Sequence, residues 1–166
     1  MDDQARIEIS IEQQCLWLIK NGKSTALPVS TALNGTGQKL NSQCTPLGEH
    51  LIRAKIGNRL PMNTVFVGRR PEPELYSPER AISEPNRDWI LTRILWLSGL
   101  EPGTNRLGDV DTMRRYIYIH GTPDSVPMGI PGSHGCIRMR NFDVIFLFDQ
   151  IEVGTRVSIY PGAKNQ

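Results

Sequence analysis

Two histidines and a cysteine fall within the seventeen residues of segment 120–136. His120 ends the run Tyr-Ile-Tyr-Ile-His, and His134 and Cys136 follow a loop rich in glycine and proline. A cysteine attacks as its thiolate, and because a free thiol is mostly protonated at neutral pH, a nearby imidazole usually activates it. A loop of fifteen residues, 121–135, is long enough to fold Cys136 back onto His120. The spacing therefore predicts a Cys–His nucleophilic site.

The neighbours of Cys136 favour the same chemistry. Gly135 allows the backbone to approach a substrate closely, and the N–H groups of Gly135 and Cys136 are placed to form an oxyanion hole. If residues 136–140 are extended, Cys136, Arg138 and Arg140 project to one side while the residues between them pack inward. The bidentate fork of Arg138 would then suit a substrate carboxylate.

Structural interpretations compete with each of these. A lone cysteine is more often a buried thiol. His120, His134 and Cys136 are also possible zinc ligands, although spacings of fourteen and two without an obvious fourth Cys or His make this the weaker hypothesis. His50 stands alone and is expected to be a packing or surface residue. Cys15 and Cys44 are expected to be ordinary thiols. Solvated charges are expected at Arg114, Arg115 and Arg140.

The elements that must position this site are mostly short strands. Alternating or apolar runs predict strands at 6–12, 15–20, 23–29, 49–56, 90–97 and 116–120, and a closing strand around Val157 and Ile159. Asn21-Gly22 is a hairpin turn. In the strand 116–120, Tyr116, Tyr118 and His120 share a face, so Tyr118 is a candidate for the pocket wall. Asn141 is the expected N-cap of a helix from Phe142 to Ile151 that is apolar nearly all round and should be buried.

The composition indicates one folded domain. The chain has 166 residues, of which 39% are hydrophobic and 22% charged, and its formal charge of +2 calls for neither nucleic acid nor an acidic membrane. No apolar run approaches the ~20 residues of a membrane span. Three cysteines, an odd number, favour a reducing compartment over a disulfide scaffold. The start Met-Asp-Asp-Gln lacks the features of a secretory signal, so we expect the cytoplasm, or the periplasm if a leader has been removed.

The segment from His120 to Met139 resembles the signature of L,D-transpeptidase catalytic domains of the YkuD type. Its two parts are His-Gly-Thr and, sixteen residues after the first histidine, the cysteine of Ser-His-Gly-Cys-Ile-Arg-Met. Further segments are similar to the same family, namely Leu16-Trp17-Leu18, Asn21-Gly22, 28–31, 45–48 and 153–157. The resemblance covers most of the chain, whereas the polar, Pro-rich segment 69–88 has no counterpart in it.

The resemblance implies a mainly β fold, a YkuD-like sandwich of short mixed strands with one buried helix near 141–151. It spans a single domain, 1–166, in which 69–88 is an irregular, lid-like excursion. It also implies a site in which Cys136 is the nucleophile, His120 the base, and the carbonyl of Gly121 the group that orients His120. Pocket and substrate-binding roles then fall to Ser133, His134, Gly135, Arg138 and Tyr118, with no metal or cofactor.

The activity implied is cleavage of peptidoglycan stem peptides, or soluble muropeptides, between the diamino acid at position 3 and D-Ala at position 4. Transfer of the resulting thioester to water makes an L,D-carboxypeptidase, and transfer to an amine makes 3–3 crosslinks. Given the expected cytoplasmic location, an L,D-carboxypeptidase of murein recycling is favoured over a crosslinking transpeptidase. A non-catalytic peptidoglycan-binding protein is the alternative of another class.

Overall fold

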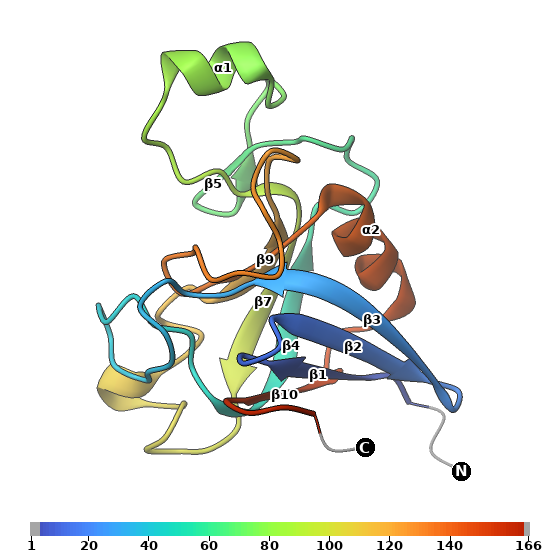
Figure 1. Ribbon diagram of the computed structural model, residues 1–166, viewed down its shortest axis with the longest axis vertical. Helices are drawn as coiled ribbons and strands as arrows, with labels where there is room; N and C mark the ends of the chain where they lie inside the picture. Colours follow the sequence, from blue (N-terminus) through green and yellow to red (C-terminus); the bar gives the residue numbers. More distant parts are fainter. Residues whose placement is uncertain (1–3, 165–166) are drawn as a thin grey trace.

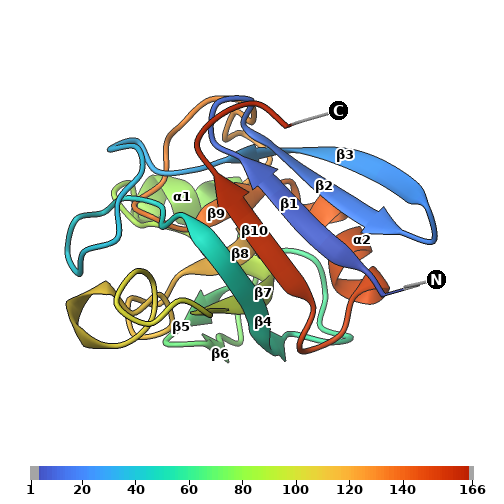
Figure 2. The ribbon, with the colours of Figure 1, turned by 90° about the horizontal axis from the view of Figure 1, so that it is seen from below.

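Eight strands form one closed circuit of hydrogen bonds in the computed structural model, which describes residues 4–164 (Figures 1 and 2). Around the circuit the order is β1-β10-β4-β7-β8-β9-β3-β2. The strands are β1 (Arg6–Ser10), β2 (Cys15–Lys20), β3 (Lys23–Ser30), β4 (Gly48–Ile56), β7 (Leu91–Gly99), β8 (Tyr118–Gly121), β9 (Ile137–Met139) and β10 (Arg156–Tyr160). The remaining elements are β5 (Phe66–Val67), β6 (Arg70–Pro71), α1 (Pro78–Ser83), a 3-10 turn (Gly108–Val110) and α2 (Asn141–Gln150).

The mainly β fold with one helix at 141–150 is confirmed, and the expected sandwich is closed at its edges. Strand β1 pairs with β2 in antiparallel fashion and with β10 in parallel, so the first and last strands of the chain are neighbours. Closure leaves no edge strand in the circuit for another chain to pair with. No helix within residues 4–164 has the length and apolar character needed to cross a membrane.

Alternation along the strands separates a core from a site face. Ile7 and Ile9 of β1 are buried, and on β8 and β9 Ile119, Ile137 and Met139 enter the same hydrophobic cluster. Successive side chains of a strand point to opposite faces. The residues between these core positions therefore face away from the cluster, which is where the predicted site residues lie.

Helix α2 differs from the expectation in two ways. Arg140 occupies the N-cap position, and Asn141, the expected cap, is the first residue of the helix. The side chain of Asn141 does not cap the helix because it is used in buried hydrogen bonds. The helix is also buried on one face only: Phe142 is 74% exposed, whereas Val144 and Leu147 are fully buried. Packing against β7 and β8 covers a single side of the helix, so its apolar sequence does not predict complete burial.

The strand expected at 116–120 begins later. Strand β8 starts at Tyr118, and Tyr116 lies in the preceding turn with a φ of 56° and half of its surface exposed. Tyr116 therefore does not continue the face shared by Tyr118 and His120. The turn is closed by hydrogen bonds from the Tyr116 N–H to Met113 and from the Ile117 N–H to Thr112, a pattern that residue alternation does not reveal.

Segment 69–88 is more ordered than its composition suggests. The β5–β6 hairpin reaches into it, and α1, capped by the Ser77 hydroxyl, lies in Figure 1 at the end of the molecule remote from both termini. The Glu72 carboxylate accepts hydrogen bonds from Arg80 at 2.8 Å and from Arg87 at 2.9 Å. These ion pairs connect the start of the excursion to its end.

His50 is a packing residue, in line with the structural interpretation of the sequence. It is fully buried, with Nδ1 3.0 Å from the Gly48 carbonyl and Nε2 3.0 Å from the Thr112 hydroxyl. The carbonyl can only accept, so Nδ1 carries the hydrogen and Nε2 accepts from Thr112. Burial lowers the pKa of His50 to about 4.

This buried imidazole predicts a loss of stability in acid. The unfolded chain, with a histidine pKa of about 6.5, binds the proton more tightly than the folded one. The contribution of His50 is therefore complete above about pH 6.5 and declines by about 3 kcal/mol toward pH 4. Urea unfolding of His50→Gln should show a flatter pH profile than wild type over this window. Parallel profiles would contradict the assignment.

Candidate active site

Cys136 and His120 lie on the same side of two adjacent strands and line the same cavity. Strands β8 and β9 are parallel, with His120 opposite Arg138, and Cys136 immediately precedes β9. The Tyr118 N–H donates to the Cys136 Sγ at 3.3 Å, and the thiol donates to the Tyr116 carbonyl at 3.4 Å. The cavity has a volume of about 440 Å³. The structure thus brings the predicted nucleophile and base into one pocket.

The His120 ring is fixed by its own backbone. Its Nδ1 lies 2.6 Å from the Gly121 carbonyl, which can only accept, so Nδ1 carries the hydrogen. Burial lowers the pKa of His120, although the Gly121 carbonyl and Asp88 oppose this effect. A neutral ring with hydrogen on Nδ1 has its lone pair on Nε2, the state that a general base needs.

Gly121 has no room for a side chain. An added Cβ would lie 2.5 Å from the Asn141 Oδ1 and 2.7 Å from the Leu91 carbonyl. Asn141 is itself held, since its Oδ1 accepts from the Thr92 hydroxyl and its Nδ2 donates to the Thr122 carbonyl at 3.0 Å. The amide therefore packs against the peptide whose carbonyl orients His120. The sequence indicated Asn141 only as a helix cap.

Burial favours the neutral form of the Cys136 thiol. Burial raises the pKa of Cys136 to about 12, and the Asp88 carboxylate adds to the rise, while the Tyr118 N–H, Arg138 and Arg115 oppose it. With the pKa of His120 lowered, the pair at neutral pH is a thiol and an imidazole, without a preformed ion pair. If Cys136 is the nucleophile and His120 its base, proton transfer from sulfur to Nε2 would accompany attack on a substrate.

The loop before Cys136 is held by the Ser133 hydroxyl. Its Oγ donates to the Cys136 carbonyl and accepts from the Gly135 N–H at 3.2 Å. The Thr45 hydroxyl donates to the Gly135 carbonyl at 2.9 Å. Gly135 has a φ of 130°, which favours glycine. Because its N–H is engaged by Ser133, the Cys136 N–H is the remaining backbone donor of the expected oxyanion hole.

Asp88, which the sequence did not single out, connects the excursion to the site. Its carboxylate accepts from Arg138 at 2.8 Å and lies 3.3 Å from the His134 Nδ1. Burial alone would raise the pKa of Asp88, but His120, Arg138 and His134 together lower it. Arg138 also donates to the Gly132 carbonyl at 2.9 Å, so both ends of its fork are occupied. A substrate carboxylate would have to displace Asp88 to reach it.

Arg115 is a second residue that the sequence analysis assigned differently. It was expected to be a solvated charge, but it lines the cavity and is partly buried. Its guanidinium donates to the carbonyls of Gly37 and Cys44 and to the Ser42 hydroxyl. These partners come from a loop distant in sequence, so no local pattern signals them. Arg114 and Arg140 are exposed, as expected.

The zinc alternative has no supporting ligand cluster. Within residues 4–164, His, Cys, Asp and Glu side chains do not gather in a group of three or more that could hold a metal ion. Within that part of the chain, His134 is exposed and has Asp88 as its charged partner.

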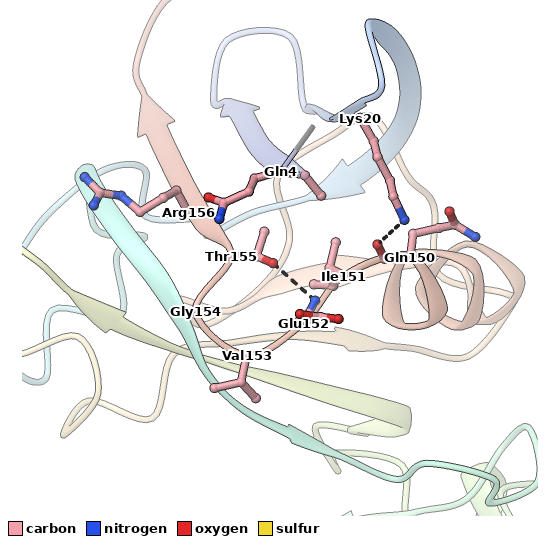
Figure 3. A pocket seen from close by; sticks show the side chains of 10 residues that line it. Gln4, Lys20, Gln150, Ile151, Glu152, Val153, Gly154, Thr155 and Arg156 are labelled. Atoms are coloured by element: carbon pink, nitrogen blue, oxygen red, sulfur yellow. Dashed lines mark hydrogen bonds between the residues drawn. The ribbon is translucent and has the colours of Figure 1, made fainter. Parts of the chain in front are cut away.

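A larger cavity, of about 500 Å³, lies between the end of α2 and the start of β10 (Figure 3). Lys20, which reaches into it, donates to the Gln150 carbonyl at 3.0 Å, and the Thr155 hydroxyl accepts from the Glu152 N–H. Its lining holds no cysteine or histidine and is separate from the pocket of Cys136. Nucleophilic chemistry therefore points to the smaller cavity.

Comparison with known proteins identifies the family to which the chain belongs. The sequence profile of the L,D-transpeptidase catalytic domain, YkuD, matches residues 4–159. "Probable L,D-transpeptidase YbiS" of Escherichia coli (strain K12) is 51% identical over 43 residues, 26% of this chain and 14% of that protein.

Two solved structures share the fold. L,D-transpeptidase 3 from Mycobacterium tuberculosis, in complex with a faropenem-derived adduct, aligns with a TM-score of 0.57 and 16% identity over 93% of this chain and 59% of its own. The L,D-transpeptidase from Xylanimonas cellulosilytica aligns with a TM-score of 0.54 and 19% identity over 96% and 62%. The chain thus spans less than two thirds of the length of each of these relatives.

The neutral thiol predicts slow alkylation at neutral pH. In a Cys15→Ser/Cys44→Ser background, iodoacetamide should modify Cys136 more slowly at pH 7 than it modifies the same chain in 6 M guanidinium. The native rate should still be rising at pH 10, because the thiolate fraction grows until the pH reaches the pKa. Mass spectrometry gives both rates. A native plateau below pH 8.5 would instead indicate a thiolate–imidazolium pair.

The crowding at Gly121 predicts an effect of a single methyl group. Gly121→Ala should separate β8 from β7 or push Asn141 away, lower the free energy of unfolding by about 1–3 kcal/mol, and misplace the carbonyl that orients His120. Gly162→Ala is the matched control, because nothing lies within 4 Å of its added Cβ. The midpoint temperature of thermal unfolding and the acylation rate should both fall in Gly121→Ala and should both stay unchanged in Gly162→Ala. Unchanged acylation in Gly121→Ala would show that the carbonyl does not position the base.

Proposed function

The chain belongs to the L,D-transpeptidase catalytic domain family, and on that premise we propose that it is a cysteine acyl-transferase of peptidoglycan stem peptides. It cleaves the bond between the diamino acid at position 3 and D-Ala at position 4. The observation that carries this proposal is a single pocket lined both by Cys136 and by His120, whose ring is fixed by the Gly121 carbonyl. A protein that only bound murein would have no need of this pair.

The geometry supports a general-base route. Nε2 of His120 takes the thiol proton as Sγ attacks the position-3 carbonyl, and the Cys136 N–H donates to the oxygen that becomes negative. The C–N bond then breaks, and the imidazolium returns its proton to the amine of D-Ala. This leaves a thioester on Cys136. A water molecule that gives its proton to His120 attacks the thioester and releases the tripeptide, and the thiolate recovers the proton.

We favour water as the acceptor, which makes the enzyme an L,D-carboxypeptidase. Gly68, Arg69 and Asp88 of the excursion region line the pocket. The ion pairs of Glu72 with Arg80 and Arg87 brace the excursion internally, and the pair of Asp88 with Arg138 attaches it to β9, so it acts as a fixed wall. A fixed wall restricts access of a second stem peptide but not of water. Such an enzyme suits soluble muropeptides in the cytoplasm, as in murein recycling, and fractionation of cells carrying the untagged protein tests that location.

The alternative is a transpeptidase that forms 3–3 crosslinks. It is favoured by the activity in the name of the Escherichia coli relative, which is 51% identical over the matched segment. In that case an acceptor amine takes the place of water at the thioester. The two activities share the same acyl-enzyme and differ only in its fate.

Product analysis separates them. Purified protein given disaccharide tetrapeptide should release D-Ala and leave tripeptide, with few 3–3 dimers as the acceptor concentration rises, and mass spectrometry quantifies both. Cys136→Ala should abolish turnover while keeping the fold, and His120→Ala should lower it by about 10²–10⁴-fold or more. Cys44→Ala is the control thiol. Dominant dimer formation would favour the transpeptidase.

Faropenem, which forms an adduct in the Mycobacterium tuberculosis structure, provides a probe independent of turnover. One covalent adduct is expected on wild type and none on Cys136→Ala. Full turnover by Cys136→Ala would refute the cysteine mechanism.

A further inference from the structure

Arg69 and Arg115 line the pocket of Cys136, Arg138 follows Cys136 by two residues, and the three arginines differ in what they bind. The guanidinium of Arg115 is used by backbone carbonyls, and that of Arg138 by Asp88 and the Gly132 carbonyl. Arg69, which also lines the pocket, has no carboxylate partner among residues 4–164. Arg115 has no carboxylate partner either, but backbone carbonyls and a hydroxyl use its N–H groups, whereas Arg69 donates a single hydrogen bond among the described residues. Arg69 is therefore the cation of the pocket that has N–H donors left for a ligand.

Aromatic side chains hold the Arg69 guanidinium in place. It lies 4.8 Å from the Trp96 ring centre and 4.9 Å from that of Tyr116, and it donates to the Tyr118 hydroxyl at 3.1 Å. Trp96 is anchored in turn by its indole N–H, which donates to the Met113 carbonyl. A guanidinium ordered in this way loses little freedom when it binds a ligand.

The backbone at Arg69 is also unusual. Gly68 and Arg69 form the two-residue turn of the β5–β6 hairpin, with φ values of 53° and 66°. Both central positions of such a turn favour glycine or asparagine. An arginine in this conformation is consistent with a role for its side chain at the pocket.

Tyr118 sets the separation between Arg69 and the thiol. Its backbone N–H donates to the Cys136 Sγ and its hydroxyl accepts from Arg69, so the length of one tyrosine residue, from backbone nitrogen to hydroxyl, separates the two groups. The side chain of a diaminopimelate has a similar length from its α-carbon to its far carboxylate. A position-3 residue whose carbonyl is attacked by Cys136 would place that carboxylate at Arg69.

We propose that Arg69 is a specificity-determining residue that binds a free carboxylate at the end of the position-3 side chain. The inference rests on the proposed function, because it assigns the diamino acid of that substrate. A diaminopimelate would form charge-assisted hydrogen bonds with the guanidinium. A lysine at position 3 ends in an ammonium group, which the guanidinium repels.

Matched tetrapeptides test this assignment, one with diaminopimelate and one with lysine at position 3. Wild type should favour the first, and Arg69→Met should lower its kcat/KM by about 10- to 100-fold while leaving the lysine peptide within about twofold or improving it. Arg70→Met is the matched control, since Arg70 is exposed in the same hairpin and does not line the pocket. Equal thermal stability of both variants excludes misfolding as the cause.

A third peptide, with diaminopimelate at position 3 and D-alaninamide at position 4, separates the two carboxylates of the substrate. If Arg69→Met removes discrimination against the amide and not against lysine, Arg69 binds the leaving group and the position-3 assignment is wrong. Equal use of the diaminopimelate and lysine peptides by wild type overturns this inference alone. Turnover of no peptide overturns the proposed function and the inference with it.

Discussion

The site depends on one hydrogen bond, from the His120 Nδ1 to the Gly121 carbonyl. A backbone carbonyl has no charge and cannot rotate, so it fixes the ring only if its own peptide is fixed. The crowding of Gly121 against Asn141 and the Leu91 carbonyl supplies that rigidity. The hydroxyl of Thr92 and the carbonyl of Thr122 complete the set, and the orientation of the base is thus inherited from the pairing of β7 with β8 and from the start of α2.

A neutral orienting group has an electrostatic consequence. An Asp or Asn in this role would act on the ring through a side chain, and an Asp would stabilise an imidazolium. Here the nearest carboxylate, Asp88, is neutralised by Arg138, and burial dominates both pKa values, lowering that of His120 and raising that of Cys136. Burial thus favours the uncharged forms of both groups, and under the proposed function the pair would react when a substrate accepts the electron pair of sulfur.

The sequence predicted most strands of the circuit and the helix α2, because these depend on local alternation and short spacing, but it did not predict the β5–β6 hairpin or α1. It missed Asp88 and misassigned Arg115 because their partners lie far along the chain, at Arg138 and at Cys44. Asn141 was predicted to cap the helix, and its role as a buried amide beside Gly121 was missed, because a helix cap and a buried amide have the same local sequence. Charges in particular are poorly predicted, because whether an arginine is solvated or bound is decided by tertiary contacts.

The difference between an arginine with bound N–H groups and one with free N–H groups explains how arginines in and near one pocket can have different roles. A guanidinium whose N–H groups are used by carbonyls or by a carboxylate is a structural element, with few donors left for a ligand. Arg115 and Arg138 hold the loops that flank Cys136 in this way. Arg69 is held from the side by aromatic rings and a hydroxyl, which fix its position without neutralising it. A site can thus be rigid and still present a cation to a ligand, provided that the contacts that order the cation leave some of its N–H donors unused.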